Sequence, residues 1–564
     1  MSRADRPGAA VPDAAAGPGP GRGDTARRTL IRREPGPGGY RGLEDGPGEP
    51  HVVRDDLCPA GGGGWPAGGD RVAELLHLTD FQLADLSSPS RLEFLQRLAG
   101  VPAWRRMLPA VRPQEFLLEQ ALEMVARTVR RAVADGTVSP DVAVSTGDNT
   151  DSAQLDELRR YLALLDGGPV RPAAGTGDPY PTTSGDPHYW NPEPGSTDRW
   201  RSDRGFPQYP GAVAAAAAPF TATGLGLPWL ACFGNHDCLL QGRVPAPAGY
   251  DDFLTGDRKP VALPAGAEPG DDALDRYLQD PYRFSAGPAV PVTASADRRM
   301  VSRAEWVGAH LDGGEPAGHG FTERNADDGT GYYCWDGVPG LRVVALDTTN
   351  PAGGVDGCVD ERQFEWLERC LAQVHSRYTG TDGREVDGGG QDQVVVVCSH
   401  HGLSTLTNGT GDGTWGGRLR LAAEVERLLH RFPNVVLWLS GHTHVNRVTP
   451  RPGPAGGFWE VSTSSIAEWP VQVRSLALTL VPGHGITVRS TVLDSDAPAA
   501  PDGGTGVEQL ASLHREVAAN DDGSVGGLQA QGARTDRNVE LRTPRAAGVL
   551  EALVAGRRRS AVPT

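Results

Sequence analysis

The chain has 564 residues, 38% hydrophobic and 6% aromatic, a composition typical of a globular protein with one large core or two ordinary ones. Its 75 glycines and 47 prolines predict many loops and long insertions. The formal net charge of −17 disfavours a nucleic-acid partner, because phosphates would be repelled unless a local basic patch intervened.

Cysteine spacing and apolar runs restrict the class and the compartment. The seven cysteines contain no Cys-x-x-Cys pair and fit neither a disulfide framework nor a zinc–thiolate site. No run of eighteen apolar residues is present, so we expect no transmembrane helix and no membrane partner. Arg27-Arg28 lacks the following apolar segment of a twin-arginine export signal, so the sequence predicts a cytoplasmic protein.

The N-terminal half predicts alternating strands and helices. Residues 1–24 are rich in Ala, Gly and Pro and are predicted to be disordered, and turn residues make 25–71 an extended lead-in. We expect the main domain over 72–495. Its first elements are a strand at 72–79, a helix at 115–134, a strand at 141–146, a helix at 153–165 and a strand at 227–233.

Two long insertions, at 166–224 and 239–331, interrupt this alternation. Turn residues dominate both, apart from a helical pattern at 272–278. The first holds an aromatic group of Tyr180, Tyr189, Trp190 and Trp200. These rings could stack on a base or a lipid-like group, but the favoured interpretation is that they anchor the loop. Trp415 could line a site or serve packing, with neither interpretation favoured.

The C-terminal half continues the pattern and adds late hairpins. The predicted elements are strands at 332–336 and 341–346, a helix at 360–377 with Asp360 as its N-cap, a strand at 393–399, a helix at 418–432, and strands at 435–439, 458–462, 475–481 and 486–493. Residues 496–564 form a polar tail with one short helix at 507–518. Strands that alternate with helices predict an α/β sandwich.

Five predicted strands each end at a cluster of polar side chains. The clusters are Asp80/Gln82, Asp148, Asn235/His236/Asp237, His400/His401 and His442/His444. Ligand sites in open α/β sheets lie beyond the carboxyl ends of the strands, so we expect the clusters to meet in one crevice. Oxygen donors mixed with imidazoles suit manganese, iron or zinc rather than calcium alone. The donors suffice for two metal ions that share a carboxylate, an arrangement that promotes phosphoryl transfer.

Each cluster taken alone has an ordinary explanation. Gly-Asp-Asn is a common turn, and a histidine after a strand can be a satisfied core residue. Five such clusters in succession at strand ends are an improbable coincidence, so we favour the metal site.

In this order the motifs resemble those of the calcineurin-like metallophosphoesterases. The family pattern is Asp-x-His, Gly-Asp-x-x-Asp/Asn, Gly-Asn-His-Asp/Glu, a His after a strand, and Gly-His-x-His. The resemblance covers residues 72–495 with the two insertions. It implies a four-layer α/β/β/α sandwich with a dinuclear metal centre.

The resemblance also implies a role for each residue. Asp80, Gln82, Asp148 and His444 would hold the first metal, and Asp148 would bridge to a second held by Asn235, His400 and His442. A hydroxide between the metals would attack phosphorus. His236, oriented by Asp237, would stabilise phosphoryl charge or protonate the leaving oxygen. His400 is preferred to His401 because the family ligand directly follows its strand.

Gln82 departs from the family pattern, which usually has His at this position. A neutral amide oxygen lacks the affinity of an imidazole, so the first site should bind more weakly and favour manganese. Asp-x-Gln is similar to the start of the manganese-dependent ADP-ribose/CDP-alcohol diphosphatases, and the long insertions resemble an actinobacterial group of the family. The first of these resemblances favours a nucleotide or phosphodiester substrate.

The sequence therefore predicts a metal-dependent phosphoesterase that hydrolyses a phosphomonoester or phosphodiester of a small molecule. One alternative is a nuclease of the same fold, which the charge of −17 disfavours. Another is a catalytically weak protein that binds phosphate ligands, which Gln82 supports and the His236-Asp237 pair opposes.

Overall fold

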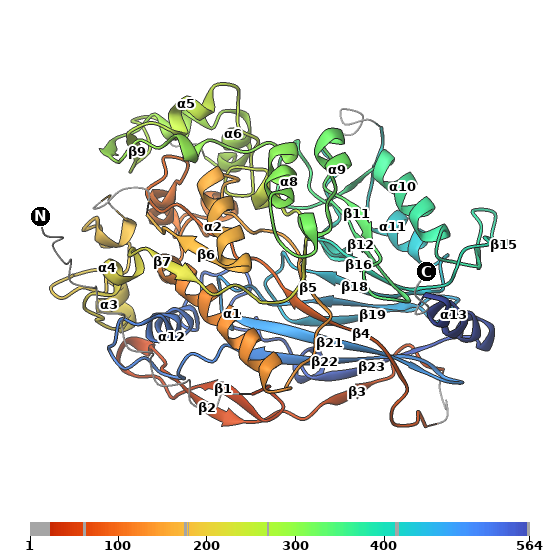
Figure 1. Ribbon diagram of the computed structural model, residues 1–564. Helices are drawn as coiled ribbons and strands as arrows, with labels where there is room; N and C mark the ends of the chain where they lie inside the picture. Colours follow the sequence, from red (N-terminus) through yellow and green to blue (C-terminus); the bar gives the residue numbers. More distant parts are fainter. Residues whose placement is uncertain are drawn as a thin grey trace, which may run out of the picture.

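The computed structural model describes residues 23–59, 64–173, 178, 180–267, 270–411 and 417–560. Trp415 lies outside the described residues, and so do residues 1–22 of the segment predicted to be disordered. Two large β-sheets lie face to face at the centre, with helices on their outer sides (Figure 1). The expected α/β/β/α sandwich is therefore confirmed.

The first sheet has seven strands in the order β3-β23-β22-β21-β4-β5-β8. Its strands are β3 (Val52–Arg54), β4 (Asp70–Leu78), β5 (Val142–Ser145), β8 (Trp229–Ala231), β21 (Gln472–Val481), β22 (Gly485–Asp494) and β23 (Val539–Pro544). β4, β5 and β8 run parallel, and β21 pairs antiparallel with β4. These parallel strands are almost wholly buried. Strands covered on both faces need continuous apolar runs, which is why their sequences do not alternate.

The second sheet has six strands in the order β11-β12-β16-β18-β20-β19. They are β11 (Tyr333–Trp335), β12 (Leu341–Ala345), β16 (Val394–Cys398), β18 (Val435–Ser440), β19 (Arg447–Arg451) and β20 (Phe458–Ser462). The four inner strands are parallel, and the edge strands β11 and β19 are antiparallel to their neighbours. Smaller two-stranded ribbons are β1 (Arg28–Arg32) with β2 (Leu43–Pro47), β13 (Val359–Asp360) with β17 (Leu419–Arg420), and β14 (Arg377–Thr379) with β15 (Glu385–Asp387).

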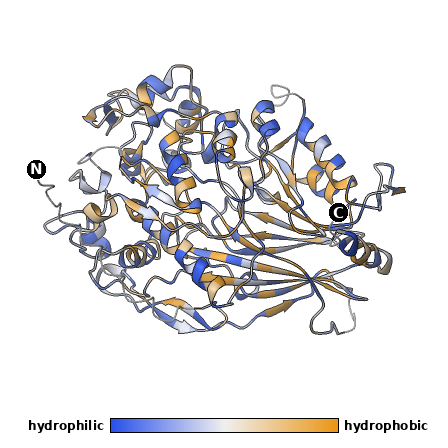
Figure 2. Ribbon diagram, in the orientation of Figure 1, coloured by the Kyte–Doolittle hydropathy of each residue, from blue (hydrophilic) through white to orange (hydrophobic). Residues whose placement is uncertain are grey.

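Helices of the outer layers include α1 (Leu118–Ala134), α2 (Leu155–Asp166), α10 (Glu361–Ala372) and α11 (Ala422–Leu429). Alternate residues of β16 face opposite sides, with Val394 in the core shared by the two sheets and Val395 in a cluster with α10 and α11. Figure 2 shows the same pattern as apolar strands beneath helices with polar outer faces. Asp360 caps α10, as expected, by accepting a hydrogen bond from the Gln363 N–H (2.9 Å).

The ends of two helices differ from the prediction. Helix α10 ends at Ala372, before the chain enters β14 at Arg377. Helix α11 begins only at Ala422, because Leu419 and Arg420 pair with β13 as a short strand. Residues that form ladder hydrogen bonds are unavailable for a helical turn, so tertiary pairing overrides the local helical pattern.

The insertions hold more regular structure than their turn-rich sequences predict. The first contains β6 (Gly168–Val170), α3 (Arg199–Arg204), α4 (Ala212–Ala216) and β7 (Phe220–Ala222). The second contains α5 (Tyr250–Leu254), β9 (Arg258–Pro260), α6 (Ala273–Gln279), α7 (Tyr282–Ser285), β10 (Ala289–Pro291), α8 (Arg303–Leu311) and α9 (Glu323–Asp328). Helix α8 starts with a capping box formed by Ser302 and Glu305, and its Trp306 packs against Phe233 in the main core.

Trp190 and Trp200 of the aromatic group in the first insertion serve packing, in agreement with the favoured interpretation. Trp190 is 1% exposed and joins Phe116, Phe206 and residues of α12 (Val507–Ala518) in one cluster. The indole N–H groups of Trp190 and Trp200 donate to backbone carbonyls within the insertion. These rings therefore anchor the insertion to the domain.

Segments outside 72–495 are integral to the same fold. β3 from the lead-in pairs with β23 from the tail at the edge of the seven-stranded sheet. Helix α12 lies where the sequence predicts and packs against α1 (Figure 1), and α13 (Ala547–Ser560) follows β23. Among the described residues, no helix is long and apolar enough to span a membrane.

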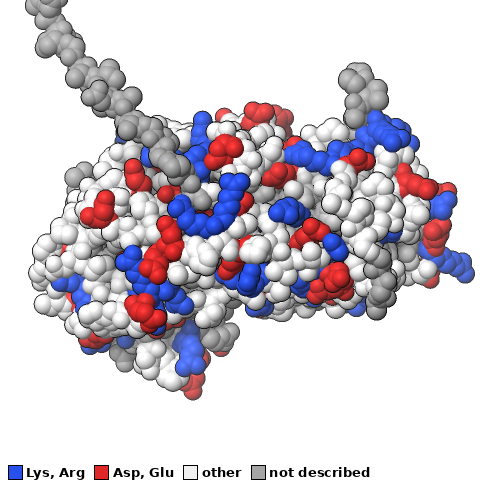
Figure 3. All heavy atoms as spheres, turned by 90° about the horizontal axis from the view of Figure 1, so that it is seen from below, with Lys and Arg blue, Asp and Glu red and all other residues white. Residues whose placement is uncertain are grey.

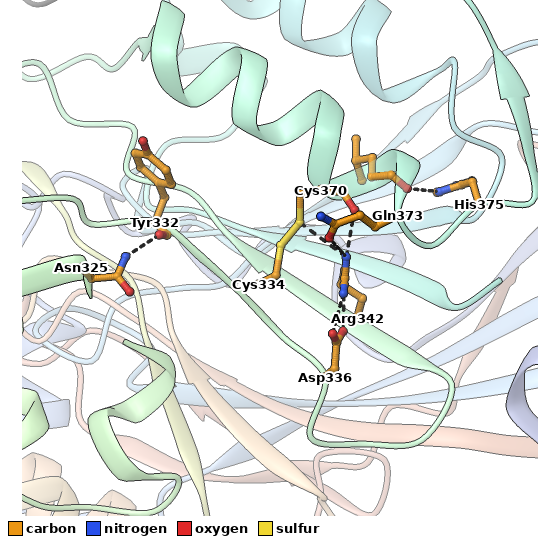
Figure 4. The surroundings of a disulfide bond; sticks show 9 residues. Asn325, Tyr332, Cys334, Asp336, Arg342, Cys370, Gln373 and His375 are labelled. Carbon is orange, nitrogen blue, oxygen red and sulfur yellow. Dashed lines mark hydrogen bonds and ion pairs between the residues drawn. A yellow bond between two sulfur atoms is a disulfide. The ribbon is translucent and has the colours of Figure 1, made fainter. Parts of the chain in front are cut away.

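One disulfide joins Cys334 of β11 to Cys370 of α10 (Figure 4). Beside it, Arg342 donates to the Cys370 carbonyl (2.9 Å) and to Asp336. The other cysteines, 58, 232, 238, 358 and 398, are free thiols. The cysteine spacing predicted no disulfide framework, and this bond was not expected, since two cysteines 36 positions apart meet only through tertiary packing.

Candidate metal centre

The five polar clusters meet where the parallel strands of the two sheets end. The Asp80 N–H donates to the carbonyl of Gly147 (3.1 Å), beside Asp148. The His442 N–H donates to Asp80 Oδ2 (3.1 Å), and the Gly441 N–H donates to the carbonyl of His400 (3.0 Å). The loops of Asp80, Asp148, His400 and His442 therefore converge at one place, as predicted.

Backbone strain is concentrated in the loops of this crevice. Five residues with side chains adopt left-handed φ angles: Asp80 (54°), Gln82 (45°), Asp148 (54°), His442 (66°) and His444 (57°). Each such residue costs about 1–2 kcal/mol, and strain of this kind gathers at functional sites. Gly441 is required by close packing, because a Cβ there would collide with Thr79 and Asp80.

Asp148 lies at the centre of the cluster and is 1% exposed. Its Oδ1 accepts a hydrogen bond from the His236 N–H (2.9 Å), and its Oδ2 lies 3.2 Å from His400 Nε2. Burial favours the neutral carboxyl, but the charges of His400 and His236 outweigh it and hold the pKa of Asp148 well below its usual range. Asp148 is therefore an ionised carboxylate, as metal ligation requires.

The hydrogen bonds distinguish His400 from His401. His400 Nδ1 lies 2.9 Å from the Thr146 carbonyl, to which it can only donate, so Nε2 is the ring nitrogen that faces Asp148 and His442 and that would ligate a cation once it has lost its proton. In His401 both ring nitrogens are occupied, Nδ1 by Thr348 Oγ1 and Nε2 by the Val355 carbonyl, each at 2.9 Å. The geometry thus favours His400 as a ligand.

His444 is oriented by a carboxylate that the sequence analysis missed. Its Nδ1 lies 2.8 Å from Glu468 Oε2, and its Nε2 lies 3.1 Å from Asp80 Oδ1. Burial disfavours the imidazolium, but Glu468 and Asp80 outweigh it and raise the pKa of His444 to about 10. A carboxylate behind an imidazole is the usual way to aim the other ring nitrogen at a metal.

Asn235 supplies an independent sign that the residues fit a cation. Its Nδ2 donates to the Gly242 carbonyl (2.9 Å). Its Oδ1 is buried and has no hydrogen-bond partner among the described residues. Because buried polar atoms are nearly always paired, this oxygen fits a metal ligand. Ligand atoms of Asp80, Asp148 and His400 also lie within 4.8 Å of one another, so the donor set fits a metal.

The structure does not place Gln82 as expected. Its Oε1 accepts a hydrogen bond from Arg112 Nη2 (2.5 Å), and its Nε2 donates to Asp148 Oδ2 (3.2 Å). The oxygen that would ligate the first metal therefore faces a guanidinium. Arg112 was not foreseen, because it comes from an irregular segment far from the motif.

The expected partner of His236 is also different. His236 Nδ1 donates to the Asp151 carbonyl (2.8 Å). Asp237 instead accepts hydrogen bonds from the N–H groups of Asn149, Thr150 and Gly234. Asp151 therefore orients His236, while Asp237 ties the Asp148 and Asn235 loops together.

Comparison with known proteins gives a family match and distant likenesses in fold. No curated protein matches the chain. Among solved structures, a dimetal phosphatase from Danio rerio is 12% identical, with 76% of this chain and 100% of that chain covered and a TM-score of 0.34. A sulfate thiohydrolase, SoxB, from Thermus thermophilus is 16% identical over 88% and 62% of the two chains (TM-score 0.28). A purple acid phosphatase from yellow lupin, Lupinus luteus, is 10% identical over 79% and 53% (TM-score 0.27).

These TM-scores are too low to support an argument, so the assignment depends on the family match. The calcineurin-like phosphoesterase model matches residues 74–446, which is well over half of the chain and includes every strand-end cluster up to His444. The chain belongs to the calcineurin-like phosphoesterase family.

Proposed function

We propose that this phosphoesterase hydrolyses a phosphomonoester or phosphodiester of a small molecule with the help of two divalent cations. The observation that carries this proposal is the buried, unpartnered Oδ1 of Asn235, in the loop whose next residue, His236, donates its N–H to Asp148. Asp80, Asp148 and His444 would hold the first cation. Asp148, Asn235, His400 and His442 would hold the second.

The cations and the residues around them would have separate catalytic roles. Two bound cations supply acidification of a water and neutralisation of phosphoryl charge. His236 has a side chain 13% exposed, and its Nδ1–H is fixed on the Asp151 carbonyl. When the ring is protonated, Nε2–H is thereby the group that would donate a proton to the leaving oxygen. Manganese is our preferred metal, with iron or zinc compatible with the same donors.

The charge of the protein favours a small-molecule substrate over a nucleic acid. The face shown in Figure 3 mixes basic and acidic side chains without one continuous basic band. The net charge of −17 also opposes a polyanionic partner. A nuclease of the same fold remains the alternative enzyme, and a phosphate-binding protein the alternative without turnover.

The test combines metal analysis of the purified protein with hydrolysis of bis(p-nitrophenyl) phosphate and p-nitrophenyl phosphate, with and without manganese. We expect close to two metals per chain and manganese-stimulated release of nitrophenol. Bound metal with no release from either compound would support the binding protein, and faster cleavage of single-stranded DNA would support the nuclease. A protein that takes up no metal would refute the proposal.

Glu468→Gln should weaken metal binding, because the carboxylate that aims His444 becomes a neutral amide. We expect a loss of about 10–100-fold in the affinity of one manganese equivalent, the range found for partners of metal-binding histidines. The measurement is calorimetric titration of metal-free protein. Glu365→Gln, at a side chain 62% exposed on α10, is the matched control and should titrate like the wild type. Unchanged affinity in Glu468→Gln would contradict the orienting role.

The disulfide favours an oxidising compartment over the cytoplasm expected from the sequence, since cytosolic thiols are kept reduced. We expect the denatured, unreduced protein to show five titratable thiols of its seven cysteines, and seven after reduction. Cys370→Ser should lower the melting temperature, because a cross-link over 36 positions contributes roughly 3–4 kcal/mol. Cys58→Ser, at a free thiol, is the control for the melting temperature. Seven titratable thiols without reduction would refute the bond.

A further inference from the structure

The amide of Gln82 lies between a guanidinium and the central carboxylate of the crevice. Arg112 Nη2 donates to Gln82 Oε1 at 2.5 Å, and Gln82 Nε2 donates to Asp148 Oδ2 at 3.2 Å. A guanidinium can only donate hydrogen bonds, so the Gln82 atom that faces it must be the oxygen. The amino group therefore faces Asp148, and this direction follows from chemistry rather than from amide assignment.

Arg112 is held firmly in this position. It is 8% exposed, its Nε donates to Glu468 Oε1 at 2.8 Å, and its Nη1 lies 3.8 Å from Glu115 Oε1. Moving the guanidinium away would leave two buried carboxylates, Glu468 and Glu115, without this partner, which is costly. Gln82 is 3% exposed and cannot exchange Arg112 for solvent.

An amide ligates a cation through its oxygen, and its N–H group has no lone pair to offer. Turning Gln82 so that Oε1 faced the cations would break its bond to Arg112. The same rotation would place the NH₂ group against the guanidinium, with donors facing donors. In this arrangement Gln82 turns its Oε1 toward Arg112 and presents to Asp148 an N–H group, which cannot ligate a metal.

We propose that Gln82 is a positioning residue for Asp148 and not a metal ligand, so that the first metal position has three side-chain ligands, Asp80, Asp148 and His444. Arg112 fixes Gln82, and Gln82 fixes the carboxylate that both cations share. Glu468 holds both Arg112 and His444, so one buried network of hydrogen bonds and ion pairs sets the geometry of the first position. This inference rests on the proposed dinuclear function.

The test is titration of metal-free protein with Mn²⁺, read from the electron paramagnetic resonance signal of the free ion. Gln82→Met preserves side-chain volume and removes both hydrogen-bonding atoms, and His444→Ala removes a proposed ligand. We expect Gln82→Met to bind two equivalents with affinities within about threefold of the wild type, while kcat for bis(p-nitrophenyl) phosphate falls about tenfold at unchanged KM. His444→Ala should lose one equivalent.

Loss of one equivalent from Gln82→Met, as from His444→Ala, would overturn the inference and leave the dinuclear function intact. A wild-type protein that binds no Mn²⁺ would instead refute the proposed function. If Gln82→Met does not fold, the structure of the wild-type protein with Mn²⁺ decides the question. Gln82 Oε1 bonded to Arg112 would support the inference, and Oε1 within about 2.6 Å of an ion would overturn it.

Discussion

Asp148→Asn is expected to reduce phosphoester hydrolysis by about 1,000-fold or more, the largest effect of any single substitution proposed for this protein. Asp148 is the carboxylate that accepts from the His236 N–H and faces His400 Nε2 and Gln82 Nε2. An asparagine has a nearly identical shape but no charge, and one of its two arms would be a donor. Both cations would lose their shared anionic ligand.

The measurement is the hydrolysis rate of bis(p-nitrophenyl) phosphate together with the metal content of the variant. We expect less than two metals per chain along with the lost rate. Asp203→Asn, at an exposed carboxylate of α3, is the matched control and should behave like the wild type. Full turnover with two metals in Asp148→Asn would contradict the bridging assignment.

His236→Ala should separate catalysis from metal binding. The His236 ring is anchored on the Asp151 carbonyl, and its Nε2 lies 3.9 Å from Asp148 Oδ2, so no proposed ligand depends on it for orientation. We expect turnover to fall by about 100-fold or more, the typical effect of removing a general acid, with two metals retained.

The control for this variant is His484→Ala. His484 lies in the turn between β21 and β22, beside the start of β4, whereas Asp80 follows the end of β4. It should leave both turnover and metal content unchanged. If His236→Ala loses metal, His236 contributes to the ligand set and the assignment of its role is wrong.

The outline of the sandwich was predictable because its signals are local. Runs such as Val394–Cys398 carry enough β-branched, apolar residues to specify a buried strand from a few neighbours. The ends of elements were less predictable, as at α11, where Leu419 and Arg420 form a strand through a partner far along the chain. The lead-in and tail strands β3 and β23 were missed for the same reason, since β3 pairs with β23, and β23 with β22, across segments remote in sequence.

The sequence by itself determined the family, the order of the strand-end clusters and the donor types offered to a metal, because each motif lies within a few residues of one strand. Only the tertiary structure decided how those side chains are directed and what stands behind them. Glu468 behind His444, Arg112 against Gln82 and Asp151 against His236 are contacts between separate loops. Successive residues after a strand point to opposite sides, so His400 and His401 differ in role only once the sheet has a defined face toward the crevice.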